Sequence, residues 1–93
     1  MLRITEVSKD DEAITLRLEG KLVGRWIPEL ERICLYNRDE KNKTVVLDFS
    51  SVTFIHKKGV RMLERIQDRR LKIINCSPFI ESLLYDLVIK DKK

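Results

Sequence analysis

The spacing of apolar residues along this chain changes repeatedly between a period of two and a helical period, which sets the order of its strands and helices. Ile14, Leu16 and Leu18 alternate with polar residues, so this stretch predicts a strand with one buried face. An earlier strand begins at Leu2, and the polar residues 8–12 separate the two. Strands with so short a connection pair as an antiparallel hairpin.

A helical period begins after the hairpin. Ile27, Leu30 and Ile33 fall on one helical face, and a proline suits the first turn, which predicts a helix over residues 27–36. The polar residues 37–43 predict a connection to the next strand.

Residues 44–49 are almost all apolar and largely β-branched, as expected of a strand buried on both faces. Residues 50–56 retain apolar side chains without a helical period, so we interpret them as a structured connection. Helical spacing then returns, which predicts a second helix that reaches Arg70 and packs on the sheet through Val60 and Leu63.

A last strand is predicted over residues 71–75, and Ser77 with the proline after it begins a third helix whose apolar face reaches Leu87. The resulting order is β-β-α-β-α-β-α. Strands joined through one helix run parallel with right-handed crossovers. We therefore predict an α/β fold, a small mixed β-sheet with helices packed on it and residues 44–49 in its centre. We expect the whole chain, 1–93, to form a single domain.

The composition fits a folded domain. Hydrophobic residues make up 43% of the chain and charged residues 37%, which leaves enough apolar surface to build a core. The first residues contain no apolar export signal and no apolar run is long enough to span a membrane, so we expect a cytoplasmic protein. Cys34 and Cys76 have no Cys or His neighbours at metal-ligand spacing, so we interpret both as reduced thiols and expect neither a metal nor a cofactor.

The net charge of +4 comes from the second half of the chain. Residues 1–50 hold nine Lys or Arg against ten Asp or Glu, whereas residues 51–93 hold ten against five. Glu64 and Asp68 interrupt a series of basic residues at every fourth position of the second predicted helix: Lys57, Arg61, Arg65 and Arg69. This pattern is typical of a solvated face with ion pairs, and no aromatic residues are interleaved with it, so nucleic-acid binding is not favoured.

Residues 45–60, VVLDFSSVTFIHKKGV, resemble the signature of the STAS domain, a family shared by anti-sigma factor antagonists and the cytoplasmic tails of sulfate transporters. In that family an apolar strand ends in Asp, and Asp-Ser-Ser-Gly or a variant of it opens the next helix. Residues 16–22 are similar to the family's second strand with its glycine, and residues 73–87 are similar to its last strand and helix. The resemblance covers nearly the whole chain and implies a STAS-like fold.

The chain departs from the family at the residues that carry its regulation. In regulated members, a partner kinase phosphorylates a serine directly after an aspartate at the start of the second helix. Here His56 stands in place of the aspartate, Lys57 in place of the acceptor serine and Lys58 at the next position, and only Gly59 remains. Because a lysine offers no hydroxyl, the phosphoswitch of the family cannot operate at this position.

The start of the second helix is also unusual in its charge. A helix amino terminus carries a partial positive charge, so each cation there costs about 0.3 to 1 kcal/mol unless an anion compensates it. Two lysines at this place are either solvated or face an acidic partner or a bound anion. By the resemblance, this helix start is the partner surface. The predicted partner-binding residues are His56, Lys57, Lys58, Gly59, Arg61 and Trp26, the last as an interface anchor or a core plug.

The candidate catalytic residues are better interpreted as structural. We expect His56 to cap its helix, because no Ser, Cys or carboxylate accompanies it at triad spacing, and Asp48 to cap the turn after its strand. We therefore predict no enzymatic activity.

The resemblance implies a protein–protein interaction module of bacterial transcription regulation, similar to an anti-sigma factor antagonist, whose partner is an anti-sigma factor or a kinase-like protein. Two alternatives stay open: an accessory subunit of a transporter complex, and an anion- or nucleotide-binding module that uses the start of the second helix. The oligomeric state is also open, a homodimer included.

Overall fold

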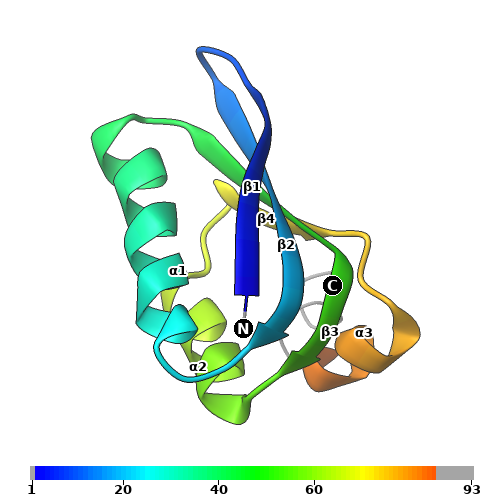
Figure 1. The fold of residues 1–93 in the computed structure, drawn as a ribbon. Coiled ribbons are helices and arrows are strands. Elements are labelled where there is room, and N and C mark those ends of the chain that lie inside the picture. Colours follow the sequence, from blue (N-terminus) through cyan, green and yellow to red (C-terminus); the bar gives the residue numbers. More distant parts are fainter. Residues whose placement is uncertain (1, 86–93) are drawn as a thin grey trace.

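A four-stranded sheet in the order β1-β2-β3-β4 organises the fold in a computed structural model that describes residues 2–85 (Figure 1). β1 (Leu2–Lys9) and β2 (Ala13–Leu22) form the predicted antiparallel hairpin. β3 (Thr44–Ile55) runs parallel to β2, and β4 (Leu71–Ile74) runs parallel to β3. The predicted mixed sheet, with β3 as an inner strand, is confirmed.

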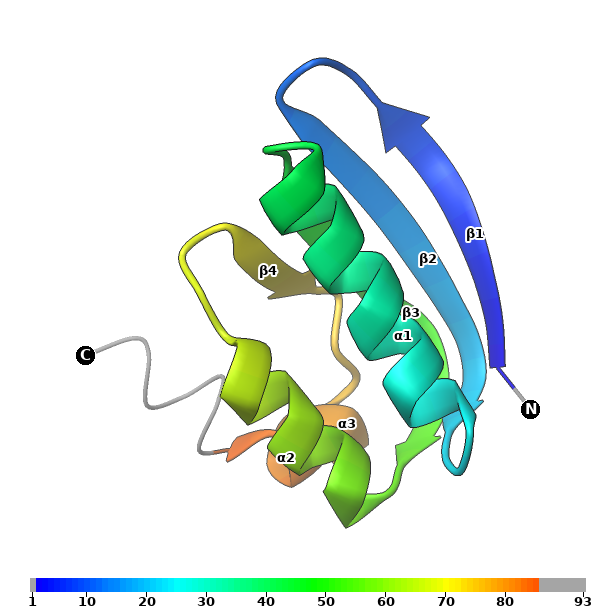
Figure 2. The same cartoon turned by 90° about the vertical axis from the view of Figure 1, so that its left-hand side faces the viewer.

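Two longer helices cover one face of the sheet (Figure 2). α1 (Trp26–Leu35) continues directly into a π-helical turn, η1 (Tyr36–Glu40), and α2 (Lys57–Ile66) lies beside α1. The sequence predicts that helical structure ends at residue 36, but Arg38 holds η1 in place, because its guanidinium donates a hydrogen bond to the Ile66 carbonyl at the end of α2. A contact between distant parts of the chain thus extends the first helix.

A shorter helix follows the last strand. α3 (Pro78–Leu83) packs against β3. The Oγ of Ser77 accepts a hydrogen bond from the backbone N–H of Ile80 at 3.2 Å, which is the predicted cap. The predicted end of this helix at Leu87 lies outside the described residues.

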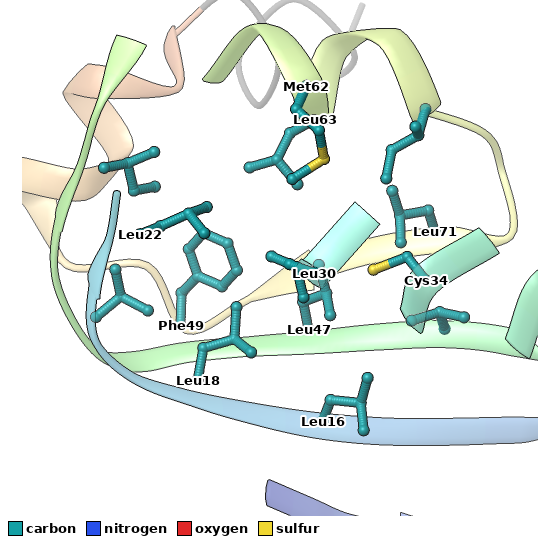
Figure 3. Close-up of a cluster of buried hydrophobic side chains, with 14 of the residues drawn as sticks. Leu16, Leu18, Leu22, Leu30, Cys34, Leu47, Phe49, Met62, Leu63 and Leu71 are labelled. Atoms are coloured by element: carbon teal, nitrogen blue, oxygen red, sulfur yellow. The ribbon is translucent and has the colours of Figure 1, made fainter. Parts of the chain in front are cut away.

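The hydrophobic core lies between the sheet and the helices (Figure 3). Leu18 of β2 and both Leu47 and Phe49 of β3 point from the sheet toward the helices and are fully buried. Leu30 of α1 and Leu63 of α2 close over them. Every second residue from Ile14 to Leu18 and from Val45 to Phe49 therefore contributes to one core.

β3 is longer than predicted. The sequence predicts a strand over 44–49 and a connection over 50–56, whereas pairing with β2 continues to Ile55. The pairing register shifts twice, once after Arg17 of β2 and once after Gly20. Each shift leaves an extra residue in β3 and interrupts the alternation of buried and exposed positions, so this half of the strand shows no period of two.

The other corrections concern burial and the end of α2. β3 is not buried on both faces, because Val46 points away from the core and is only half-buried. α2 ends at Ile66 instead of Arg70, since the Asp68 carboxylate accepts a hydrogen bond from the Arg70 N–H at 3.1 Å and favours a turn. α2 packs on the core through Leu63, which is fully buried, and through Val60, which is partly buried, as predicted.

Candidate functional site

His56 begins α2 as its N-cap residue. Its backbone is extended, and its Nδ1 accepts a hydrogen bond from the backbone N–H of Lys58 at 3.0 Å. The side chain therefore satisfies one of the amide groups that a helix start leaves without a partner. The predicted capping role of His56 is confirmed.

Gly59 is buried in the first turn of α2. A Cβ at this position would lie 3.0 Å from the Cγ2 of Ile55 and 3.3 Å from the Cδ2 of Leu22, tighter than ordinary van der Waals contact. The absence of a side chain thus allows α2 to approach the ends of β2 and β3 closely. Gly59 sets the position of the helix start and presents no side chain to a partner.

The cations at the start of α2 are exposed and unpaired. Within residues 2–85, no carboxylate lies within ion-pair distance of Lys57, Lys58 or Arg61. Arg65, one turn further along, is instead bound to Glu31 of α1, with 2.7 Å between Nη2 and Oε1. The predicted basic series along the helix therefore does not form a continuous stripe, all the more because α2 ends before Arg69.

A half-open groove of about 530 Å³ lies beside these cations, between the end of β3, α2 and α3. Phe54, with 37% of its surface exposed, gives it an aromatic wall, and Lys57 and Arg61 lie on its rim with Glu64. We call this site the α2 groove. It is lined by Phe54, Ile55, His56, Lys57, Val60, Arg61, Glu64 and Leu83.

The structure brings together some of the predicted site residues and separates others. His56, Lys57 and Arg61 line the α2 groove, and Lys58 is exposed next to it. Trp26 lies elsewhere, at the start of α1, where it is half-buried against the core with the Arg25 guanidinium 5.0 Å from its ring centroid. Phe54 was not among the predicted site residues, because its only signal in the sequence is a large apolar side chain outside any regular period.

Asp48 binds the backbone two residues further on, as predicted, but it does so at the first register shift within β3 and not in a turn after the strand. Its Oδ1 accepts hydrogen bonds from the Ser50 backbone N–H at 2.9 Å and from the Asn75 side-chain amide at 3.3 Å, and its Oδ2 lies 3.7 Å from the Nε of Arg17. The Ser50 N–H is the largest cause of a lowered pKa for the Asp48 carboxyl, and Asn75 and Arg17 add to it. The carboxylate therefore has a structural role on the face of the sheet away from the core.

We expect Asp48→Asn to lower the free energy of unfolding at pH 7 by about 1 to 2 kcal/mol, because an amide replaces the charged acceptor. A carboxyl whose pKa is lowered by folding stabilises the protein above its unfolded value, here 3.8, and this stabilisation is lost as the pH falls through the folded value. The difference in the free energy of unfolding between the wild type and the variant, measured by urea unfolding, should therefore become smaller below about pH 4. A constant difference from pH 7 to pH 3 would contradict the assigned role of the charge.

The described residues offer little for metal or thiol chemistry. Within residues 2–85, no three histidine, cysteine or acidic side chains gather as metal ligands. Burial raises the pKa of the Cys34 thiol to about 12, which keeps it protonated, and Cys76 is half-buried. The helices of this part of the chain are too short and too polar to cross a membrane.

Comparisons with known proteins agree with the fold. No family model matches the chain, and no curated protein does. Among solved structures, the chain is similar to the anti-sigma factor antagonist SpoIIAA in its unphosphorylated form, with a TM-score of 0.66 and 18% sequence identity. The match covers 90% of this chain and 83% of that one. The chain therefore has the STAS-like fold of an anti-sigma factor antagonist, as the resemblance in its sequence predicted.

Proposed function

We propose that this chain is a protein–protein interaction module that binds its partner through the α2 groove and the cations at the start of α2. The observation that carries the proposal is the exposed Phe54 in an apolar groove whose rim carries Lys57 and Arg61. A buried aromatic anchor surrounded by polar residues is the usual anatomy of a binding hot spot.

The partner surface in this proposal is acidic. Lys57 and Lys58 lie at the helix end where cations are unfavourable, and no carboxylate within residues 2–85 compensates them. Acidic side chains of a partner would supply the missing compensation and speed association. The likeness to an anti-sigma factor antagonist supports an anti-sigma factor or a kinase-like protein as this partner, in the cytoplasm and in bacterial transcription regulation.

The module acts without catalysis and without a phosphoserine switch at this site. Residues 54–60 contain no hydroxyl side chain, so a serine kinase has no acceptor there. His56 uses its Nδ1 to cap the helix, which supports a structural role over that of a catalytic base. Binding in this proposal is therefore constitutive at the α2 groove.

Site-specific photocrosslinking tests the proposal. With the photoreactive residue p-benzoylphenylalanine in place of Phe54, the full chain should form a crosslink to one protein in a lysate of its source cells. An excess of unmodified chain should suppress this crosslink. The matched control carries the same residue in place of Val7 on β1, which is 48% exposed and lies outside the α2 groove.

With the photoreactive residue in place of Val7, we expect no specific crosslink, that is, none that an excess of unmodified chain suppresses. The proposal fails if neither position gives such a product, or if both capture the same protein equally. Mass spectrometry of the crosslinked peptide identifies the partner surface, which the proposal requires to be rich in Asp and Glu.

A further inference from the structure

A second groove, of about 690 Å³, lies between the β1–β2 hairpin and the end of the first helix. We call it the hairpin groove, and it shares no lining residue with the α2 groove. Its floor is apolar: Ile14 and Leu16 of β2 are buried, and Ile4 of β1 and Ile33 of α1 flank them. β1 lies at the edge of the sheet, beside α1 and not beneath it (Figure 2).

One end of the hairpin groove is basic. Lys9, Lys41 and Lys43 line it, and the strand pairing places Lys9 opposite Ile14, close to the tip of the hairpin. The ammonium group of Lys43 donates a hydrogen bond to the backbone oxygen of Asp10, in the same turn. Ile4 pairs with Leu18 and therefore lies toward the other end of the groove. The groove thus has a cationic end and an apolar end.

The charges at the basic end are only partly neutralised. Three lysines and one carboxylate, that of Glu6, line the groove, and the Asp10 carboxylate also interacts electrostatically with Lys43. Within residues 2–85, none of these lysines forms an ion pair. An anion bound at this end would therefore meet a surplus of positive charge.

The π-helical turn shapes the wall of the hairpin groove. η1 begins at Tyr36, which is 49% exposed and has the Lys41 ammonium 5.6 Å from its ring centroid. Asn37 follows it and donates a side-chain hydrogen bond to the Ile33 carbonyl at 2.9 Å. Single π-helical turns occur frequently at functional sites, where the wider turn changes the direction of side chains. Here the turn brings an aromatic ring and a cation to the same side of the groove.

We propose that the hairpin groove binds a single-chain amphiphile with an anionic head group, of the fatty-acid class. The head group lies at Lys9, Lys41 and Lys43, and the hydrocarbon chain lies between the partly buried side chains of Ile33 and Ile4. The volume of the groove falls in the range of small-ligand sites, about 300 to 1,000 Å³. Its lining combines apolar and polar side chains, which suits a ligand that has both a hydrocarbon part and a charged group. The proposal is independent of partner binding at the α2 groove.

Titration calorimetry with dodecanoate below its micelle concentration tests this site. The full chain should show saturable binding at one site, weaker binding of dodecanol and none of dodecyltrimethylammonium. Lys9→Glu with Lys41→Glu should weaken dodecanoate binding at least about tenfold, which corresponds to 1.4 kcal/mol. The matched control, Lys57→Glu with Arg61→Glu, changes the net charge by the same amount at the α2 groove and should leave the affinity unchanged.

Amide chemical shifts give a second measurement. On titration with dodecanoate, the signals of Ile33 and Tyr36 should shift, and those of Phe54 and Arg61 should not. The proposal is wrong if binding does not saturate, if the cationic amphiphile binds equally well, or if the two double variants lose affinity equally. Circular dichroism of both variants confirms that a loss of binding does not come from a loss of fold.

Discussion

Leu47→Ala should lower the free energy of unfolding by about 2 to 5 kcal/mol, as truncation of a fully buried leucine does in general. Leu47 lies on the inner strand β3, is completely buried and points toward the helices above the sheet (Figure 3). The change removes apolar contacts and leaves a cavity between the sheet and the helices, which the surrounding side chains fill only in part. Urea unfolding followed by circular dichroism measures the loss.

Val46→Ala is the matched control for this prediction. Val46 is the preceding residue of the same strand, half-buried and on the face away from the core. Its truncation should cost clearly less than that of Leu47, because less apolar surface leaves contact. A loss below about 0.5 kcal/mol for Leu47→Ala, or equal losses for the two variants, would contradict the assignment of the core face.

Lys57→Glu with Arg61→Glu should weaken binding of the protein that crosslinks at Phe54 by about tenfold or more, mainly through a slower association rate. The two cations lie on the rim of the α2 groove, and their reversal places like charges opposite an acidic partner. Folding should be unaffected or slightly favoured, because acids replace cations near a helix amino terminus. Surface plasmon resonance at two salt concentrations measures the rates.

The loss of partner affinity in Lys57→Glu with Arg61→Glu should be smaller at high salt, because screening weakens interactions between exposed charges. Lys9→Glu with Lys41→Glu is the control, since it changes the net charge equally at a separate groove. Equal loss of partner binding in both variants would indicate a general effect of net charge. No loss in either variant would show that Lys57 and Arg61 do not contribute to the interface.

The order and direction of the strands could be predicted because each depends on local patterns. The alternation at Ile14, Leu16 and Leu18 predicts a half-buried strand, and each helix between two strands forces them parallel. The cap at Ser77 and the cap at His56 are local as well, since each side chain bonds an amide two or three residues away. These are the features that sequence patterns predict reliably.

The features that the sequence did not predict depend on distant contacts. β3 continues beyond Phe49 because β2 pairs with it there, and the register shifts remove the alternation. The charge of Arg65 is compensated by an ion pair with Glu31 on another helix, so Arg65 does not add to the unpaired cations of α2. The α2 groove requires Leu83 of α3 to lie near Phe54, and no pattern within either segment indicates that meeting.

The two register shifts in β3 have a consequence for how related chains should be compared. From Arg17 to Leu22, β2 advances five residues while β3 advances seven, from Asp48 to Ile55. Each bulge absorbs one extra residue, so that Phe54 and Ile55 stay paired with Lys21 and Leu22. A change in chain length that no bulge absorbs would exchange the inward and outward positions beyond it and turn Phe54 away from the α2 groove. A related chain is therefore expected to share this binding surface only if it has the same number of residues between the positions of Asp48 and Gly59, in addition to similar side chains.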